Sequence, residues 1–71
     1  MEVINSLNCV VTFWKDGNKV FRINHNFFCD LLGMLHYELN ENKFYDRATI
    51  EWDGKLITVD PSLEAPVFST L

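Results

Sequence analysis

The sequence has little of several residue types, and each shortage argues against a class of protein. Its two cysteines, Cys9 and Cys29, are too few for a disulfide framework. We therefore expect reduced thiols in a cytoplasmic protein, and a single bridge between Cys9 and Cys29 is the alternative. No apolar run approaches the roughly 20 residues of a membrane span. The first residues, MEVINSL, lack the basic segment and long apolar run of a signal peptide.

Glycine and basic residues are also scarce. The three glycines fall in two expected turns and in the middle of an expected helix, so no glycine-rich phosphate loop is present. Six Lys and Arg stand against ten Asp and Glu, which gives a net charge of −4. This balance argues against general nucleic-acid binding, which requires clustered basic residues that displace counterions. It also falls far short of the dense carboxylate rows of a DNA mimic.

Apolar residues, in contrast, are abundant. The 71 residues form one small domain, 1–71, and a chain of this length buries only about 60% of its unfolded surface. Yet 48% of the residues are hydrophobic and 14% are aromatic. Either the core is unusually dense, or part of this apolar surface belongs to an interface.

The segment 25–40 has the period of an amphipathic helix. Asn24 or Asn26 provides a suitable N-cap. Gly33 in the middle costs about 1 kcal/mol relative to Ala, either as a tolerated residue or because a close backbone contact requires it. Steps of about 100° per residue gather five apolar side chains on one arc: Phe28, Leu31, Leu32, Leu35 and Leu39.

Residues 8–23 read as a hairpin around the turn sequence KDGN. A two-residue Asp-Gly loop would pair Val11 with Arg22, whereas a three-residue Lys-Asp-Gly loop pairs Val11 with Phe21. We prefer the second register because it groups the apolar residues on one face. The inner face is then Cys9, Val11, Phe13, Phe21 and Ile23, and the outer face is Val10, Thr12, Trp14, Val20 and Arg22.

The second hairpin, 48–59, has the clearest local signal. Asp53-Gly54 predicts a two-residue type I′ turn that pairs Trp52 with Lys55. Residues 1–7 form an ambiguous N-terminal strand. The Pro-containing tail 60–71 either wraps onto the domain, pairs with a sheet edge or stays loose. The expected inner face of the hairpin is Ala48, Ile50, Trp52, Ile57 and Val59.

The order hairpin, helix, hairpin predicts an α+β fold. We expect a ββαββ two-layer sandwich, in which one helix packs on one face of a four-stranded antiparallel sheet.

Three soft ligands, His25, Cys29 and His36, would share one side of the expected helix. Cys29 and His36 are, however, about 10 Å apart along its axis. No CxxC or HxxxH spacing supports a metal site, and no known signature supports a thiol nucleophile. We therefore expect no catalytic residue, no metal and no cofactor, and we do not expect an enzyme.

The remaining signal is apolar surface that the helix leaves uncovered, since aromatic residues are enriched in interface cores. The chain is therefore expected to be a non-enzymatic protein-binding protein, an inhibitor or modulator that occludes a larger partner. In size and composition it is similar to small inhibitors made by phages and mobile elements. The expected partner-binding residues are Trp14, Val10, Val20, Phe44 and Tyr45.

Two alternatives remain. Trp14 with Lys15, Lys19 and Arg22 could hold a single-stranded nucleic acid by stacking and phosphate contacts. A homodimeric structural subunit would also use the surplus of apolar surface.

Overall fold

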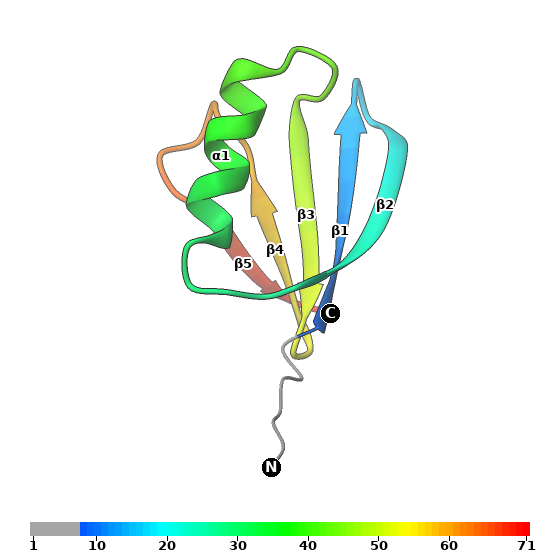
Figure 1. The fold of residues 1–71 in the computed structure, drawn as a ribbon, viewed down its shortest axis with the longest axis vertical. Helices are drawn as coiled ribbons and strands as arrows, with labels where there is room; N and C mark the ends of the chain where they lie inside the picture. Colours follow the sequence, from blue (N-terminus) through cyan, green and yellow to red (C-terminus); the bar gives the residue numbers. More distant parts are fainter. Residues whose placement is uncertain (1–7) are drawn as a thin grey trace.

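The computed structural model describes residues 8–71, so the expected N-terminal strand at 1–7 lies outside the described residues. Within this range, five strands and one helix follow one another (Figure 1). They are β1 (Asn8–Lys15), β2 (Asn18–Asn26), α1 (Leu31–Glu41), β3 (Arg47–Trp52), β4 (Lys55–Val59) and β5 (Val67–Thr70).

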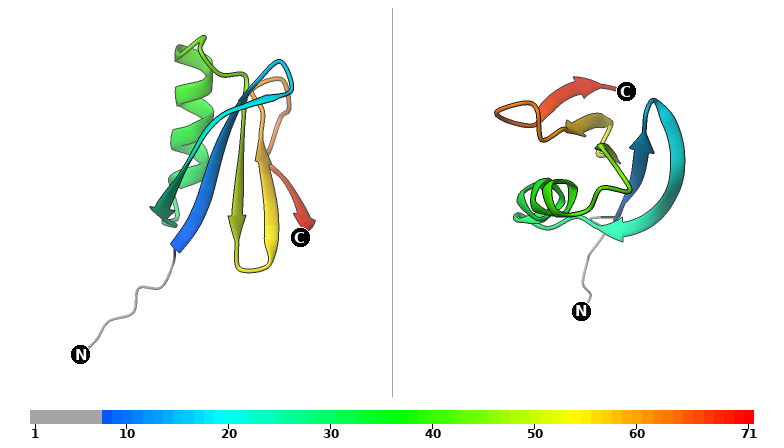
Figure 2. Two further views of the ribbon diagram at one scale, coloured as in Figure 1. Left: turned by 90° about the vertical axis from the view of Figure 1, so that its right-hand side faces the viewer. Right: turned by 90° about the horizontal axis from the view of Figure 1, so that it is seen from above.

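The strands form one antiparallel sheet in the order β2-β1-β3-β4-β5, and α1 packs on one of its faces (Figures 1 and 2). The α+β class is confirmed, but the expected four strands are wrong. Part of the tail forms the fifth strand, because β4 would otherwise present an unpaired edge and Val67–Thr70 supplies an extended segment. Lys55 pairs with Thr70 and Thr58 with Val67.

The second hairpin has the expected register. Asp53 and Gly54 have φ angles of 53° and 73°, and two consecutive positive values are what a type I′ turn requires. Trp52 pairs with Lys55, and Ile50 pairs with Ile57. Four of its five expected inner side chains are buried and Trp52 is partly buried, so the alternation alone predicted this face correctly.

The first hairpin has neither of the two simple registers. Asp16 and Gly17, with φ angles of 53° and 81°, form a two-residue turn. A shift then occurs between Phe13 and Trp14, where Val20 is the extra residue of a bulge. Because of the bulge, Val11 pairs with Ile23, so the expected pair of Val11 with Phe21 is wrong.

The bulge has a clear physical role in this hairpin. A two-residue turn without it would place Arg22 opposite Val11, on the side that packs against the core. One additional residue returns Phe21 to the same face as Phe13, where their rings stack with centroids 5.0 Å apart. The expected grouping of inner-face residues is therefore kept, although the pairing that produces it differs.

The helix begins six residues later than expected. Residues 24–26 continue β2, with Asn24 opposite Val10 and Asn26 opposite Asn8, so neither asparagine caps the helix. The chain then turns away because the ring of Phe27 stacks on Trp52, with centroids 3.8 Å apart and planes within 3°. The N-cap residue is Asp30, whose side chain makes no capping hydrogen bond.

The core lies between α1 and the middle of the sheet. Leu31, Leu35 and Leu39 are buried as expected, whereas Leu32 is partly buried and Phe28 lies outside the helix and is exposed. A methyl group on Gly33 would meet only the Asp30 side chain, at an ordinary 3.9 Å. No close packing therefore explains this glycine, which is tolerated in the helix.

One row of side chains crosses all five strands on the helix side and shows what α1 covers. In the sheet order β2, β1, β3, β4 and β5, the exposed fractions of these five side chains are 41%, 1%, 0%, 0% and 57%. The helix packs against β3 and β4, so the two ends of the row remain open. Seen from above in Figure 2, β2 arcs away from the other strands. The row is Ile23, Val11, Ile50, Ile57 and Phe68.

Candidate functional site

An open groove of about 290 Å³ runs between α1 and β2 on the helix side of the sheet. Its floor is β1, and one wall is the inner face of β2, with Phe21 and Ile23. The other wall is α1, where Met34 is 51% exposed. Phe21, which is 38% exposed, and Ile23 are continuous with the buried floor residues Val11 and Phe13. The groove is therefore an uncovered part of the core.

Aromatic rings close one end of the groove. The ring of Tyr45, which follows α1, lies 4.8 Å from Phe13 and 5.5 Å from Phe21, measured between centroids. Tilted and edge-on contacts of this kind stabilise aromatic clusters beyond the area they bury. This end is consequently formed before any partner arrives.

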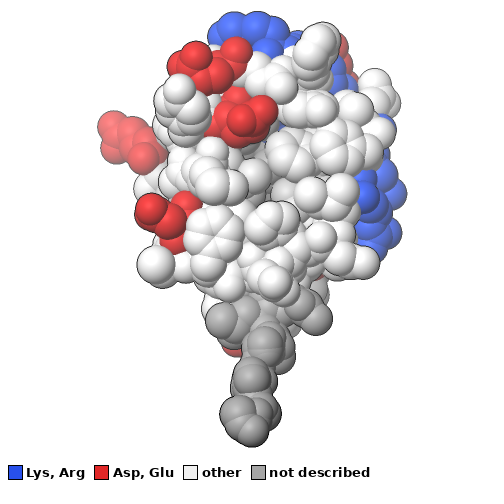
Figure 3. Space-filling model, in the orientation of Figure 1, with Lys and Arg blue, Asp and Glu red and all other residues white. Residues whose placement is uncertain are grey.

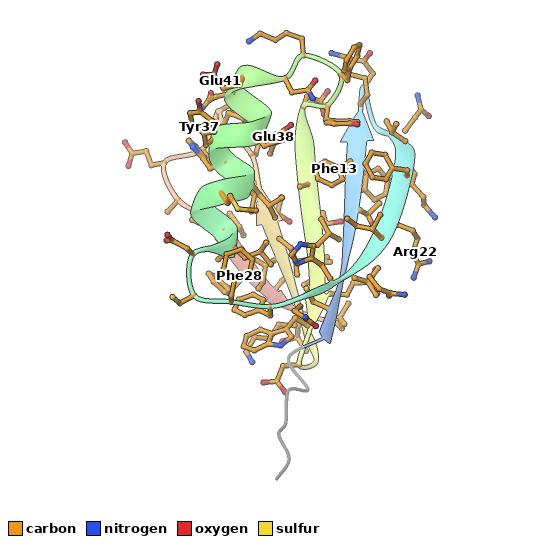
Figure 4. All side chains as sticks on the ribbon, in the orientation of Figure 1. Phe13, Arg22, Phe28, Tyr37, Glu38 and Glu41 are labelled. Carbon is orange, nitrogen blue, oxygen red and sulfur yellow. The ribbon has the colours of Figure 1, made fainter. Side chains whose placement is uncertain are left out.

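Polar groups are few and lie at the rim. Glu38 is the one carboxylate among the described residues that line the groove, and Asn42 Nδ2 donates a hydrogen bond of 3.2 Å to its Oε2. Figure 4 shows Glu38 on the side of α1 toward β3, with Tyr37 on the opposite side. Near the other end, His25 Nδ1 lies 2.8 Å from the Asn26 carbonyl oxygen. The groove therefore suits an apolar occupant with polar groups along its margins.

The opposite face of the sheet holds a separate cluster around Trp14. Its indole Nε1 donates a 2.9 Å hydrogen bond to Thr49 Oγ1, and the Arg47 guanidinium lies 4.8 Å from its ring centroid. Thr12 and Thr49 are buried, although α1 is on the other side of the sheet. Trp14 thus packs within the protein and is only partly accessible.

The five residues expected to bind a partner do not form one surface. Trp14 and Val10 lie on the outer face and are half-buried, and Val20 is exposed at the bulge. Phe44 is exposed on the loop after α1, whereas Tyr45 belongs to the groove. Of the five, only Tyr45 contributes to the groove.

The sequence did assign Phe21 and Ile23 to the inner face, but alternation does not say whether that face is covered. A helix is about 10 Å wide, whereas five strands spaced about 4.8 Å apart span about 19 Å. One helix therefore covers roughly half of such a sheet. This comparison of widths is the signal that would have identified the groove.

The alignment of His25, Cys29 and His36 does not exist, because His25 is in β2 and Cys29 is in the turn before α1. Within residues 8–71, no three His, Cys, Asp or Glu side chains are placed to hold a metal ion. Both cysteines are free thiols, and burial raises the pKa of the Cys9 thiol above its ordinary value. In the same part of the chain, no helix is long and apolar enough to cross a membrane.

Replacing Trp14 with Phe is expected to lower the free energy of unfolding by about 1–2 kcal/mol. Thr49 loses the donor of its hydrogen bond, and the cation–π contact of Arg47 is left with a smaller ring. Urea unfolding followed by circular dichroism measures this loss. Phe44→Ala, at an exposed ring on a loop, is the control and should change stability by less than about 0.5 kcal/mol. A Trp14→Phe variant as stable as the wild type would contradict the packed position of the indole.

In comparisons with known proteins, no family model, no curated protein and no solved structure matches this chain.

Proposed function

We propose that this chain is a small non-enzymatic protein-binding protein, which acts in the cytoplasm as an inhibitor or modulator by occluding a larger partner. The observation that carries the proposal is the groove between α1 and β2. Phe21, Ile23 and Met34 form its walls, and each leaves more than a third of its surface exposed. A contiguous apolar patch of this kind is typical of a protein-protein contact.

An extended or helical protein segment fits this groove better than a small molecule. The groove is open along its length, and β2 is an edge strand whose outer side no other strand of residues 8–71 pairs with. A segment beside β2 would form main-chain hydrogen bonds with it and place alternate side chains in the groove. Aromatic residues and Met line the surface, as in the cores of known interfaces.

The groove supplies anchors and not the whole binding energy. Covering the exposed parts of Phe21, Ile23 and Met34 contributes about 1 kcal/mol each. Since association itself costs several kcal/mol, a stable complex also needs contacts at the rim of the groove. The groove is thus the expected centre of a larger contact surface.

The single-stranded nucleic-acid alternative has less support. The Trp14 ring that would stack on a base already contacts Arg47, and its Nε1 is hydrogen-bonded to Thr49. Lys15 Nζ donates to the Lys43 carbonyl oxygen at 3.3 Å. A stacking platform would need a more accessible ring.

The experiment that tests the proposal is capture of the partner from the lysate of the source cell. Ile23→Asp places a charge in the groove wall and should reduce capture at least about tenfold, a loss of ~1.4 kcal/mol. Val67→Asp, at an exposed residue of β5 outside the groove, is the matched control and should capture normally.

A third variant, Val20→Asp, tests the surface expected from the sequence. Loss of capture by this variant, with normal capture by Ile23→Asp, would assign binding to the residues around Val20 and would overturn the groove. Circular dichroism of each variant confirms that it is folded.

A further inference from the structure

The two flanks of the groove have opposite charge. On the face shown in Figure 3, acidic side chains gather over α1 and basic side chains lie at the opposite flank, over β2, with uncharged surface between the two flanks. Further basic side chains lie at the top of this view, next to the acidic ones. Glu38 and Glu41 are on α1. Lys19 and Arg22 are on β2, opposite Trp14 and Thr12, so they project from the outer side of that strand and lie beyond the lining of the groove. Figure 4 shows Glu41 and Arg22 on opposite sides of this face.

We propose that a second copy of this chain occupies the groove, in a two-fold symmetric dimer whose axis runs parallel to the groove. The inference rests on the proposed function only in taking the groove as a protein-docking surface, and it names an occupant. The apolar walls provide the contact, and the charges of the two flanks select this arrangement.

Symmetry makes the charge pattern decisive. In a face-to-face dimer, an axis parallel to the groove exchanges the two flanks and keeps each residue at the same height along it. The acidic flank of each copy then faces the basic flank of the other, and this contact occurs twice. An axis across the groove would instead place acidic residues against acidic ones, which is repulsive.

The heights of Glu38, Glu41 and Lys19 agree with this arrangement. Glu38 and Glu41 lie in the last turns of α1, at the end of the molecule where β2 begins, and Lys19 is the second residue of β2 (Figure 1). Arg22 lies further along β2, below Glu38 in the view of Figure 4. The same symmetry lets the edge of β2, with Phe21 and Ile23, seat against Met34 of the other copy. Because one groove holds one occupant, the dimer and a partner complex at this site exclude each other.

Charge reversal of each flank tests the proposal with the full chain. Sedimentation velocity over a range of concentrations should show a dimer for the wild type. Glu38→Lys/Glu41→Lys makes both flanks basic, and Lys19→Glu/Arg22→Glu makes both acidic. Each variant alone should dissociate at a concentration at least about tenfold higher than the wild type.

An equimolar mixture of the two variants tests the arrangement directly. Basic flanks of one variant then face acidic flanks of the other, so a heterodimer should form. A mixture that remains monomeric while the wild type is a dimer would overturn the proposed arrangement. A wild type that is monomeric at the highest attainable concentration would overturn the dimer itself.

Ile23→Asp separates this inference from the proposed function. It should abolish the dimer, and a dimer that survives it must use another surface, which would overturn the inference. If the wild type is monomeric and Ile23→Asp loses partner capture, the dimer is contradicted and the proposed function is retained. A dimer sensitive to Ile23→Asp, with partner capture unaffected, would retain the dimer and remove the proposed function of the groove.

Discussion

Replacing Ile50 with Ala should lower the free energy of unfolding by about 4 kcal/mol, near the upper part of the range for large-to-small changes in cores. Ile50 is fully buried in β3, between Val11 and Ile57 and beneath α1, so its missing atoms leave a cavity that neighbouring strands cannot easily fill. A domain of 71 residues has a total stability of only about 4–11 kcal/mol. The variant should therefore be close to unfolded at room temperature.

Ile23→Ala is the matched control, because it removes the same atoms from the same row of the sheet. Ile23 is already 41% exposed, so we expect a loss of only about 1 kcal/mol. Urea unfolding of both variants, at a protein concentration where sedimentation velocity shows a monomer, gives the comparison. Equal losses at the two positions would show that the inner face of β2 is covered in the monomer and would contradict the open groove.

The two thiols should differ in alkylation rate by a factor of at least about 10³. This factor is the lower end of folding equilibrium constants for small domains, and it applies because a buried thiol reacts only in the fraction of molecules that are open. Cys29 is exposed in the turn before α1 and should react with iodoacetamide as a free thiol does. Cys9 is buried in β1, so its modification requires the protein to open. Peptide mass spectrometry at successive times measures both rates in one sample.

Urea provides the control for this difference. Above the unfolding transition both thiols should react at similar rates, because neither is then protected. Rapid modification of Cys9 in the native protein would show that the start of β1 opens freely. That result would contradict the pairing of β1 with β2 and the burial of Cys9 in the core.

The same burial makes stability fall in alkaline solution. Burial raises the pKa of the Cys9 thiol, so the folded state retains this proton at a pH where the unfolded state has released it. The unfolded state then binds fewer protons, and the free energy of unfolding decreases as the pH rises above about 8.5. The stabilisation is fully present below that value.

Local signals in the sequence determined much of the fold. Asp53-Gly54 flanked by strand formers predicted the turn, the register and the buried face of the second hairpin, because all three depend on neighbouring residues. The alternation in β1 and β2 likewise assigned Phe21 and Ile23 to the inner face. Leu31, Leu35 and Leu39 were predicted as core because their spacing places them on one side of a helix.

Interactions between distant residues decided the rest. The helix begins at Leu31 and not at residue 25, because β2 continues along β1 and Phe27 stacks on Trp52. The fifth strand exists because β4 offers an open edge to the tail. In the candidate site, only Tyr45 was chosen from the sequence, since exposure of Phe21, Ile23 and Met34 depends on where α1 lies. The hydrophobic pattern assigns a side chain to a face of the sheet, but only the packed structure shows which part of that face α1 leaves uncovered.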